Sequence, residues 1–408
     1  MSVDFRTRAD EDVTAVDARM FFSTSLPAAL HDARELLEPG AARLGLRPIT
    51  FEVGDQSVSL AWEDGRVAIR PPLVNPFARV RMAPEELTEL VYDQRTPMTF
   101  FTSGTLDMPA GGVDDFLDWW LVLRGALDRR PLHTAGAVSL LDRDGRALDL
   151  QRTFRLSNDG VEEMSHFLSE AGYLHIAAVF SEAEMATIAA EMDRAASSYR
   201  DGDGRSWWAT TADGVRRLVR MQGFDDRSPA TAALLRDERF LQLGAIPSDG
   251  HVHAGLDGNR IEALIKPIGV VQGISDVPWH KDCSLGRHSY DCCSLTVGVS
   301  VTGADAVSGQ LRVVAGSHRA LLRPAHVKPG SHGLPEIDLP TRTGDVTVHL
   351  SCTLHMSQPP VERERRVMYT SFRLPASRSA AAVQARARVR AARELAPQRV
   401  SQPPRQTS

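Results

Sequence analysis

The chain has 408 residues, of which 42% are hydrophobic, and this length favours two domains over one. Its 47 Lys and Arg against 52 Asp and Glu give a formal net charge of −5 without a long basic cluster, so nucleic acid is not an expected partner. The N-terminus lacks the apolar core of a signal peptide, and no apolar run approaches membrane-spanning length. We therefore expect a cytoplasmic protein without a transmembrane segment.

Residues 1–25 are expected to form a mobile lead-in to an α+β domain over residues 26–130. The spacing of Leu30, Ala33 and Leu37 predicts a helix that ends near Pro39-Gly40. Alternating polar and apolar residues then predict strands over 50–53, 58–62 and 79–82, separated by turns. A helix with Pro84 in its first turn follows, and residues 113–127 predict a strongly apolar helix.

Three phrases of this region resemble a sterol carrier protein type lipid-binding domain: VSLAWEDGRVAIRPP, APEELTELVYDQRTPMTFFTSGTLDM and GGVDDFLDWWLVLRGAL. The resemblance implies an apolar tunnel between the sheet and the helices. No residue with a defined chemical role tests it. A diverged domain that serves only for docking or solubility is an equal alternative.

A polar linker is expected over residues 131–153, followed by a second domain over 154–375. Its first part predicts helices over 158–171 and 229–244, a strand over 172–177, and a helix to Ser197 that begins with a Ser181 to Glu184 capping box. Short β-rich runs then predict an antiparallel double-sheet jelly roll, at 263–267, 294–301, 310–314, 346–350 and 367–372. An Ala/Arg-rich helix over 380–395 and a disordered tail are expected within 376–408.

A possible metal site begins with His280 and Asp282, which are two residues apart. Their side chains point the same way only on a strand or strand-like loop, and Val277-Pro278 disfavours a helix there. Alone, such a pair is a weak signal. With a third donor from a distant histidine, two imidazoles and one carboxylate would leave metal positions open, as suits non-haem Fe(II).

The segment from about Phe154 to Leu374 resembles the phytanoyl-CoA dioxygenase family of Fe(II)/2-oxoglutarate oxygenases. Several spaced motifs in order carry the resemblance: Lys266-Pro267, WHKD at 279–282, SGQLRVVAGSH at 308–318, Gly344-Asp345-Val346, LHMS at 354–357 and Arg366. Ala315 departs from the family, which usually has Pro at that turn position.

The resemblance implies that His280, Asp282 and His355 bind Fe(II). His349 lies close to His355 in the sequence and could compete with it, but the spacing to Ser357 and Arg366 favours His355. The other histidines near these motifs are expected in turns or at the surface, and Lys281 is expected to point away from the metal. These histidines are His288, His318, His326 and His332.

The resemblance also implies a site for the cosubstrate 2-oxoglutarate. Arg366, eleven residues after His355, is expected to hold the far carboxylate together with Ser357. Strand alternation is taken to place Arg366 inward, whereas two of the three guanidinium groups in the run Arg363, Arg365 and Arg366 are expected to be exposed. Thr296 is expected to contact the near carboxylate, and Lys266 is expected to line the pocket.

The cysteines Cys283, Cys292, Cys293 and Cys352 show no CxxC spacing. We expect them to be reduced, mostly buried small apolar groups, with a zinc site or a disulfide as the less favoured alternative.

The implied activity is that of an Fe(II)- and 2-oxoglutarate-dependent dioxygenase that uses O2 and releases succinate and CO2. Halogenating relatives lack the carboxylate ligand, so the presence of Asp282 favours hydroxylation, desaturation or ring formation. The lipid-carrier-like region suggests a small apolar substrate such as a lipid, a terpenoid or an acyl thioester. The alternatives are a lipid-binding or transfer protein with an inactive dioxygenase-like domain, and a Zn²⁺ hydrolase that uses the same three ligands.

Overall fold

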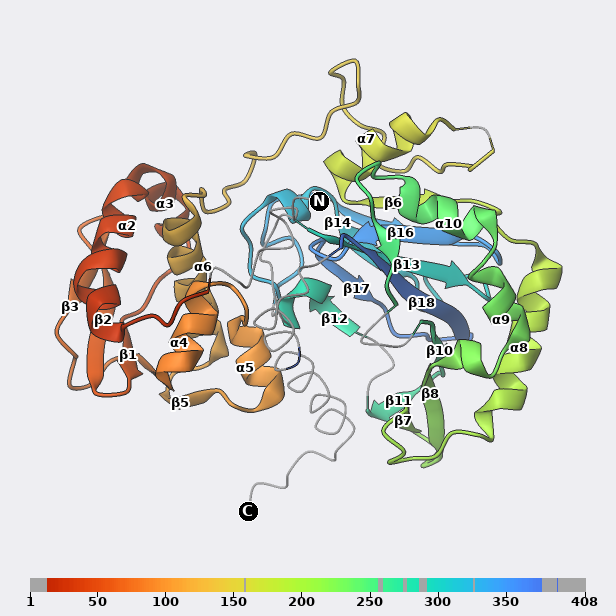
Figure 1. Ribbon diagram of the computed structural model, residues 1–408, viewed down its shortest axis with the longest axis horizontal. Helices are drawn as coiled ribbons and strands as arrows, with labels where there is room; N and C mark the ends of the chain where they lie inside the picture. Colours follow the sequence, from red (N-terminus) through yellow and green to blue (C-terminus); the bar gives the residue numbers. More distant parts are fainter. Residues whose placement is uncertain are drawn as a thin grey trace.

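The computed structural model describes residues 13–157, 159–255, 260–273, 277–285, 292–325, 327–375 and 387. Within this part of the chain, an N-terminal α+β unit and a larger, mainly β unit are joined by a long connection (Figure 1). The tail and nearly all of the helix expected beyond residue 376, residues 1–12, His288 and His326 lie outside the described residues. Among the described helices, none combines the length and the apolar character needed to cross a membrane.

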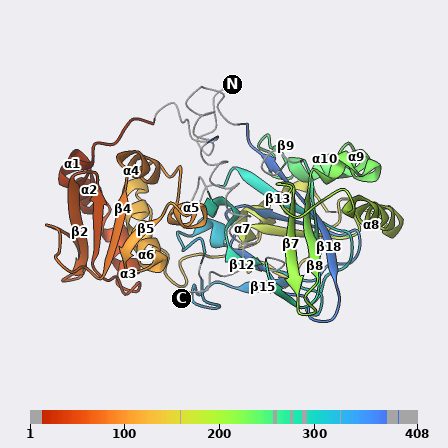
Figure 2. The same cartoon turned by 90° about the horizontal axis from the view of Figure 1, so that it is seen from below.

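A five-stranded sheet in the order β3-β2-β1-β4-β5 forms the centre of the N-terminal unit. The pair β1 and β4 is parallel, and the other pairs are antiparallel. The elements, seen from a second direction in Figure 2, are α1 (Ala18–Met20), η3 (Phe21–Ser25), α2 (Leu26–Asp32), α3 (Arg34–Ala41), β1 (Ile49–Val53), β2 (Gln56–Glu63), β3 (Arg66–Arg70), β4 (Ala78–Met82), α4 (Pro84–Val91), α5 (Pro97–Ser103), β5 (Asp107–Ala110) and α6 (Val113–Asp128).

The last part of the expected lead-in belongs to this unit and is not a mobile segment. Residues 18–25 are helical, and Phe21 and Phe22 are buried in the core together with Phe51 and Phe116. Burial of a large aromatic side chain is worth about 1.5–3 kcal/mol, so Phe21 and Phe22 both favour the attachment of this segment to the core. The aromatic pair at the end of the expected lead-in was the sequence signal for this contact.

Helix α6 is the central element of the N-terminal core, as its apolar sequence predicts. Trp119 and Trp120 are each 1% exposed, and the helix packs against β1, β4, α2, α3 and α5. Its first turn contains Asp114 and Asp115, whose charges complement the positive end of the helix dipole. The Asp115 carboxylate also accepts a hydrogen bond from the backbone N–H of Gly112, at 3.0 Å, and so caps the helix.

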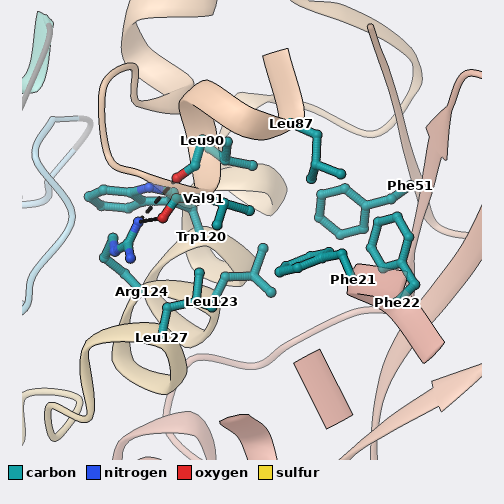
Figure 3. Close-up of a pocket in the computed structure, with 10 residues that line it drawn as sticks. All are labelled: Phe21, Phe22, Phe51, Leu87, Leu90, Val91, Trp120, Leu123, Arg124 and Leu127. Carbon is teal, nitrogen blue, oxygen red and sulfur yellow. Dashed lines mark hydrogen bonds between the residues drawn. The ribbon is translucent and has the colours of Figure 1, made fainter. Parts of the chain in front are cut away.

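The N-terminal unit lacks room for a lipid in the cavity between its aromatic side chains and α6. This cavity has a volume of about 10 Å³ and is lined by Phe21, Phe22, Trp120 and Leu123, among others (Figure 3). A space of that size holds about one water molecule. The apolar tunnel that the sterol carrier resemblance implied is therefore not found here, because close packing of the aromatic rings fills the space.

Contacts at the base of α6 fix the N-terminal unit against the β unit. The Arg323 guanidinium donates to both carboxylate oxygens of Asp118, with Nε to Oδ1 at 2.6 Å. Leu132 pairs with Leu321 in an isolated bridge, and His133 Nε2 lies 2.9 Å from the His332 carbonyl oxygen. The beginning of the expected linker is thus attached to the β unit by ordered contacts.

The β unit contains two antiparallel sheets, in agreement with the expected double-sheet architecture. The larger has the order β11-β7-β8-β10-β18-β13-β16-β6, with β9 also paired to β18, and the smaller has the order β12-β17-β14-β15. The strands are β6 (Tyr173–Ile176), β7 (Ser206–Thr211), β8 (Arg216–Gln222), β9 (Val252–His253), β10 (Glu262–Lys266), β11 (Val270–Gln272), β12 (Val277–His280), β13 (Ser294–Ser300), β14 (Leu311–Val314), β15 (Glu336–Leu339), β16 (Val346–Leu350), β17 (His355–Ser357) and β18 (Arg365–Arg373).

Helices cover the outer face of the larger sheet on one side (Figure 1). The helical elements of this unit are α7 (Val161–Ala171), α8 (Glu182–Ala196), η4 (Phe224–Asp226), α9 (Pro229–Leu234), α10 (Glu238–Ala245), η5 (Asp282–Leu285) and η6 (Ser317–Arg319). The helix expected over 229–244 is two helices, because Asp237 caps a new one by accepting a hydrogen bond from Arg239 N at 2.9 Å.

The packing of these helices decides which face of β18 is outward. Met368 Sδ lies 3.6 Å from Thr231 Oγ1 of α9, and the ring of Phe372 lies so close to Gly244 of α10 that a Cβ there would approach it to 2.2 Å. Because side chains alternate along a strand, residues 366, 368, 370 and 372 face the helices, whereas 365, 367, 369 and 371 face the interior between the sheets.

His318 and His332 lie in turns, which is one of the two positions expected for them, and both are buried. His318 is 8% and His332 6% exposed. His318 Nε2 donates to the Ser169 carbonyl oxygen at 2.8 Å, and burial lowers the pKa of this imidazole to about 4. The folded protein therefore favours neutral His318, whereas the unfolded chain begins to protonate it below about pH 6.5.

This difference predicts an acid-sensitive contribution to stability. The contribution of neutral His318 to the free energy of unfolding is fully present above pH 6.5. It falls by about 3 kcal/mol in total as the pH decreases towards 4. The His318→Asn variant should therefore show a smaller loss of unfolding free energy than the wild type between pH 6.5 and 4, measured by urea denaturation. Equal pH slopes for the two proteins would contradict this assignment.

Candidate active site

Antiparallel pairing of two short strands brings the first two candidate ligands together. In the pairing of β12 with β17, His280 lies directly opposite His355, and their ring centroids are 4.2 Å apart. Asp282 follows the end of β12 and begins η5. The carboxylate thus reaches the histidines from the first residue of a short helical turn, whereas the sequence analysis expected a strand or strand-like loop to carry both His280 and Asp282.

The donor atoms of His280, Asp282 and His355 converge. Asp282 Oδ1 lies 3.4 Å from His280 Nε2 and 3.6 Å from His355 Nε2, and one donor atom from each of the three residues lies within 4.8 Å of the others. The Asp282 side chain is 33% exposed and the His355 side chain 7%. One metal ion could therefore contact all three groups while one side of the set remains accessible.

Hydrogen bonds orient both imidazoles for metal binding. His280 Nδ1 lies 2.8 Å from the Pro278 carbonyl oxygen, and His355 Nδ1 lies 2.9 Å from the Thr353 carbonyl oxygen. A carbonyl oxygen only accepts hydrogen bonds, so each ring carries its proton on Nδ1 and presents the Nε2 lone pair to the site. This backbone support of metal-binding histidines fixes the ring orientation and the tautomer.

The electrostatics of the site favour the protonation states that a metal requires. Burial alone would raise the pKa of the Asp282 carboxyl, but His355, His280 and His349 hold that pKa well below its usual value. Burial, together with the adjacent His280 and His349 rings, holds the pKa of His355 well below its usual value. An ionised carboxylate and a neutral imidazole are both ready to bind a cation, so the donor set fits a divalent metal.

Thr296 contacts the carboxylate of Asp282, and this occupies the hydroxyl that was expected to bind the cosubstrate. Its Oγ1 on β13 donates to Asp282 Oδ2 at 2.7 Å and lies 3.1 Å from Ser351 Oγ. The bond leaves Oδ1 of Asp282 directed to the two histidines. Thr296 therefore orients a candidate metal ligand, because η5 begins with Asp282 and places its carboxylate within hydrogen-bond distance of β13.

His349 also borders the site, as its position in the sequence suggested. Its Nε2 lies 3.5 Å from Asp282 Oδ2, its ring centroid lies 4.3 Å from that of His355, and it is 1% exposed. Among the residues that the structure describes, none forms a hydrogen bond with either ring nitrogen of His349. The convergent set contains His355 and not His349, so His349 lies beside the metal position on the other carboxylate oxygen.

Arg366 does not face the interior, so the expectation for this residue is wrong. Its Nη1 donates to Asp193 at 2.7 Å and its Nε to Glu364 at 3.0 Å, on the face that the helices cover. Arg365 is the inward guanidinium and is 2% exposed. Alternation along the strand separates these two neighbours, but the sequence did not reveal that α8 covers the face of Arg366.

Arg365 belongs to a buried polar cluster with Lys266 and Ser357, both of which the sequence analysis had singled out. Lys266 lies opposite Arg365 in the pairing of β10 with β18, and its Nζ donates to Ser357 Oγ at 2.6 Å. Arg365 Nη1 donates to the Gly309 carbonyl oxygen at 2.8 Å and lies 3.4 Å from Ser357 Oγ. Arg365 Nε has no hydrogen-bond partner, and in the described part of the chain Arg365 forms no ion pair.

Comparisons with known proteins bear on the β unit. The family model described as phytanoyl-CoA dioxygenase matches residues 168–367. Solved structures with a similar fold include the non-haem α-ketoglutarate-dependent epimerase SnoN from nogalamycin biosynthesis (20% identity, 52% of this chain and 80% of that chain, TM-score 0.42). No curated protein matches the chain.

Two further structures have the same range of similarity. AviO1 from Streptomyces viridochromogenes Tue57 is 23% identical over 53% of this chain and 96% of that chain, with a TM-score of 0.43. EctD from S. alaskensis, solved with 2-oxoglutarate and 5-hydroxyectoine, is 18% identical over 60% of this chain and 86% of that chain, with a TM-score of 0.43.

The Thr296 hydrogen bond leads to a prediction about metal affinity. Thr296→Val removes the donor to Asp282 while it keeps the side-chain shape, and we expect the affinity for Fe(II) to fall roughly 10- to 100-fold. Anaerobic titration calorimetry measures this change. The matched control is Ser300→Ala on the same strand, whose hydroxyl donates to Thr341 at 2.9 Å. Equal Fe(II) affinity of Thr296→Val and the wild type would show that the contact does not orient the ligand.

Proposed function

Because residues 168–367 form a phytanoyl-CoA dioxygenase family domain, we propose that this chain oxidises a C–H bond of a small apolar substrate, with His280, Asp282 and His355 as the iron ligands. The chain is an enzyme of the non-haem Fe(II)- and 2-oxoglutarate-dependent type. The assignment of individual residues to roles, the class of substrate and the outcome of the oxidation belong to the proposal.

The observation that carries the residue assignment is the convergence of the three donor groups beside a buried cationic cluster. His355 and Ser357 are two residues apart on β17, so their side chains point to the same face and lie roughly 6.6 Å apart. A five-carbon dicarboxylate that chelates a metal at one end is of suitable length to reach Ser357 with the other. The Arg365 guanidinium and the Lys266 ammonium supply positive charge at that end.

The residues of the chain have separate tasks in this proposal. His280 and His355 present neutral nitrogen donors, Asp282 supplies the anionic donor, and Thr296 holds that carboxylate in place. Arg365 orients 2-oxoglutarate through its far carboxylate. Iron with 2-oxoglutarate and O2 supplies an oxidant strong enough to break an unactivated C–H bond, with release of succinate and CO2. Because Asp282 occupies the position that a halide would need, hydroxylation is the proposed outcome.

The N-terminal unit supports the active site in this proposal and does not carry a lipid. Helix α5 packs against η5, the turn that contains Asp282 (Figure 1). The small cavity of the unit weakens the lipid-transfer alternative. The hydrolase alternative does not account for the positive charge of the buried Arg365 and Lys266. A hydrolase that uses a metal-bound water needs no site for a dicarboxylate.

Loss of the carboxylate ligand should abolish turnover and leave the fold intact. With Fe(II), 2-oxoglutarate and O2, the wild type should form succinate, and candidate apolar compounds should increase the rate, whereas Asp282→Ala should form none above background. The control is Asp193→Ala, which removes an exposed carboxylate paired with Arg366. Succinate is measured by mass spectrometry and the fold by circular dichroism. Full activity of Asp282→Ala would remove this residue from the ligand set.

A comparison of the neighbouring arginines tests the cosubstrate site. Arg365→Ala should raise the KM for 2-oxoglutarate roughly 30-fold or more, equivalent to about 2 kcal/mol, because it removes a buried partner of the carboxylate. Arg366→Ala removes only the partly exposed pair with Asp193, so its KM should stay near that of the wild type. Arg365→Lys keeps the charge but not the planar fork, and should give an intermediate KM. The reverse order of Arg365→Ala and Arg366→Ala would contradict the orientation of β18.

A further inference from the structure

Three cysteines form a compact buried group next to the candidate iron ligands. Cys283 follows Asp282 in η5, Cys292 precedes β13, and Cys352 lies between β16 and β17. Their sulfur atoms all lie within 4.8 Å of one another, and the three side chains are buried. We propose that Cys283, Cys292 and Cys352 form a second metal site, separate from the iron centre, that binds a thiophilic d¹⁰ cation such as Zn²⁺.

The distances between the sulfur atoms match those around a single ion. Cys283 Sγ lies 3.8 Å from Cys292 Sγ and 3.6 Å from Cys352 Sγ. A Zn–S bond of about 2.3 Å in tetrahedral geometry separates the sulfur ligands by about 3.8 Å. Two of the three sulfur–sulfur distances therefore match the edges of a coordination tetrahedron, and the sulfur atoms of Cys292 and Cys352 lie within 4.8 Å of each other. Three thiolates also suit a three-coordinate ion, so the set does not require a fourth protein ligand.

A buried positive charge accompanies the sulfur atoms. Lys281 is 1% exposed, and its Nζ points away from the histidines to donate to the Ser317 carbonyl oxygen at 3.0 Å. Burial lowers the pKa of the Lys281 ammonium, whereas negative charge on Cys352, Cys283 and Cys292 would act in the opposite direction, so the lysine is close enough to interact with all three. Three thiolates around a divalent cation carry a net charge of −1, and the Lys281 ammonium compensates this charge.

The donor chemistry separates this group from the iron centre. The iron ligands are two imidazoles and a carboxylate, which suit Fe(II), whereas three thiolates select soft cations such as Zn²⁺ or Cu(I). A backbone group supports the sulfur cluster as well: Cys352 N donates to Cys292 Sγ at 3.3 Å. Such an N–H group stabilises negative charge on a sulfur ligand.

The position of the group in the chain indicates what the second metal would do. Cys283 is adjacent to Asp282, and Cys352 precedes His355 by three residues. An ion held by both cysteines would join the segment of Asp282 to the segment of His355, and Cys292 would attach both to the start of β13. Metal binding to the folded state also stabilises it by mass action. The second ion would therefore fix the geometry of the iron ligands without contacting substrate.

The test uses the full-length protein, treated with reductant and chelator, and Cd²⁺ as the probe because thiolate ligands give Cd²⁺ a characteristic ultraviolet charge-transfer absorption. The wild type should show this absorption and saturate at one equivalent. His355→Ala, which disrupts the iron site, should show the same absorption. Cys292→Ser should lose it, and the matched control Cys293→Ser should keep it, because Cys293 lies outside the cluster.

A second measurement keeps the test independent of folding defects and of the proposed dioxygenase activity. Because the iron ligands also fit Zn²⁺, this measurement uses the His355→Ala background: Zn²⁺ should raise the Tm of His355→Ala, but not that of His355→Ala combined with Cys292→Ser or with Cys292→Ala, each shown by circular dichroism to be folded. Absence of the charge-transfer absorption in the wild type, or its persistence in both Cys292 variants, would overturn the proposal. A disulfide among the three residues in the purified protein, detected by mass spectrometry before reduction, would also overturn it.

Discussion

The pairing of β12 with β17 is the constraint on which the active site depends. It places His280 opposite His355, and both rings receive support from backbone carbonyl oxygens two residues earlier in the chain. A shift of one residue in this register would turn one imidazole to the other face of the strand. The carboxylate of Asp282, in the turn after β12, completes the set of metal donors. It accepts a hydrogen bond from Thr296 of the larger sheet. Both sheets of the jelly roll thus contribute to a single centre.

Because side chains alternate along β18, one face of this strand packs against the helices and the other faces the interior between the sheets. The outward side chains of Met368 and Phe372 pack on the helices, and this packing turns Arg365 into the interior next to Lys266 and Ser357. Burial of two cations in one cluster is costly unless negative charge compensates them. A bound dicarboxylate would supply that charge.

Much of this arrangement could be predicted from the sequence, because the relevant signals are local. The apolar helix α6, the Ser181 capping box and the β-rich block after residue 261 all appear where their patterns indicated. The convergence of His280, Asp282 and His355 was anticipated from spaced motifs. The prediction that Arg366 points inward was wrong. Both faces of β18 are covered, and the alternation of side chains along a strand does not by itself tell which face packs against the helices.

The remaining differences have the same origin in tertiary packing. The contact of Thr296 with Asp282 depends on how η5 lies against β13, and no sequence pattern indicates that position. The gathering of Cys283, Cys292 and Cys352 depends on folding that brings Cys352 next to two cysteines 60 or more residues earlier in the chain. In the N-terminal unit, Phe21 and Phe22, which had been assigned to the lead-in, fill the core next to Phe51, and the cavity beside them is too small for a lipid.

The most direct measurement of the central claim is an anomalous-difference map, recorded across the iron absorption edge, from anaerobic crystals grown with Fe(II) and 2-oxoglutarate. The account predicts one iron peak in contact with His280 Nε2, His355 Nε2 and the Asp282 carboxylate, and 2-oxoglutarate density that extends from this peak to Arg365. An iron peak at any other position, or cosubstrate density directed away from Arg365, would contradict it.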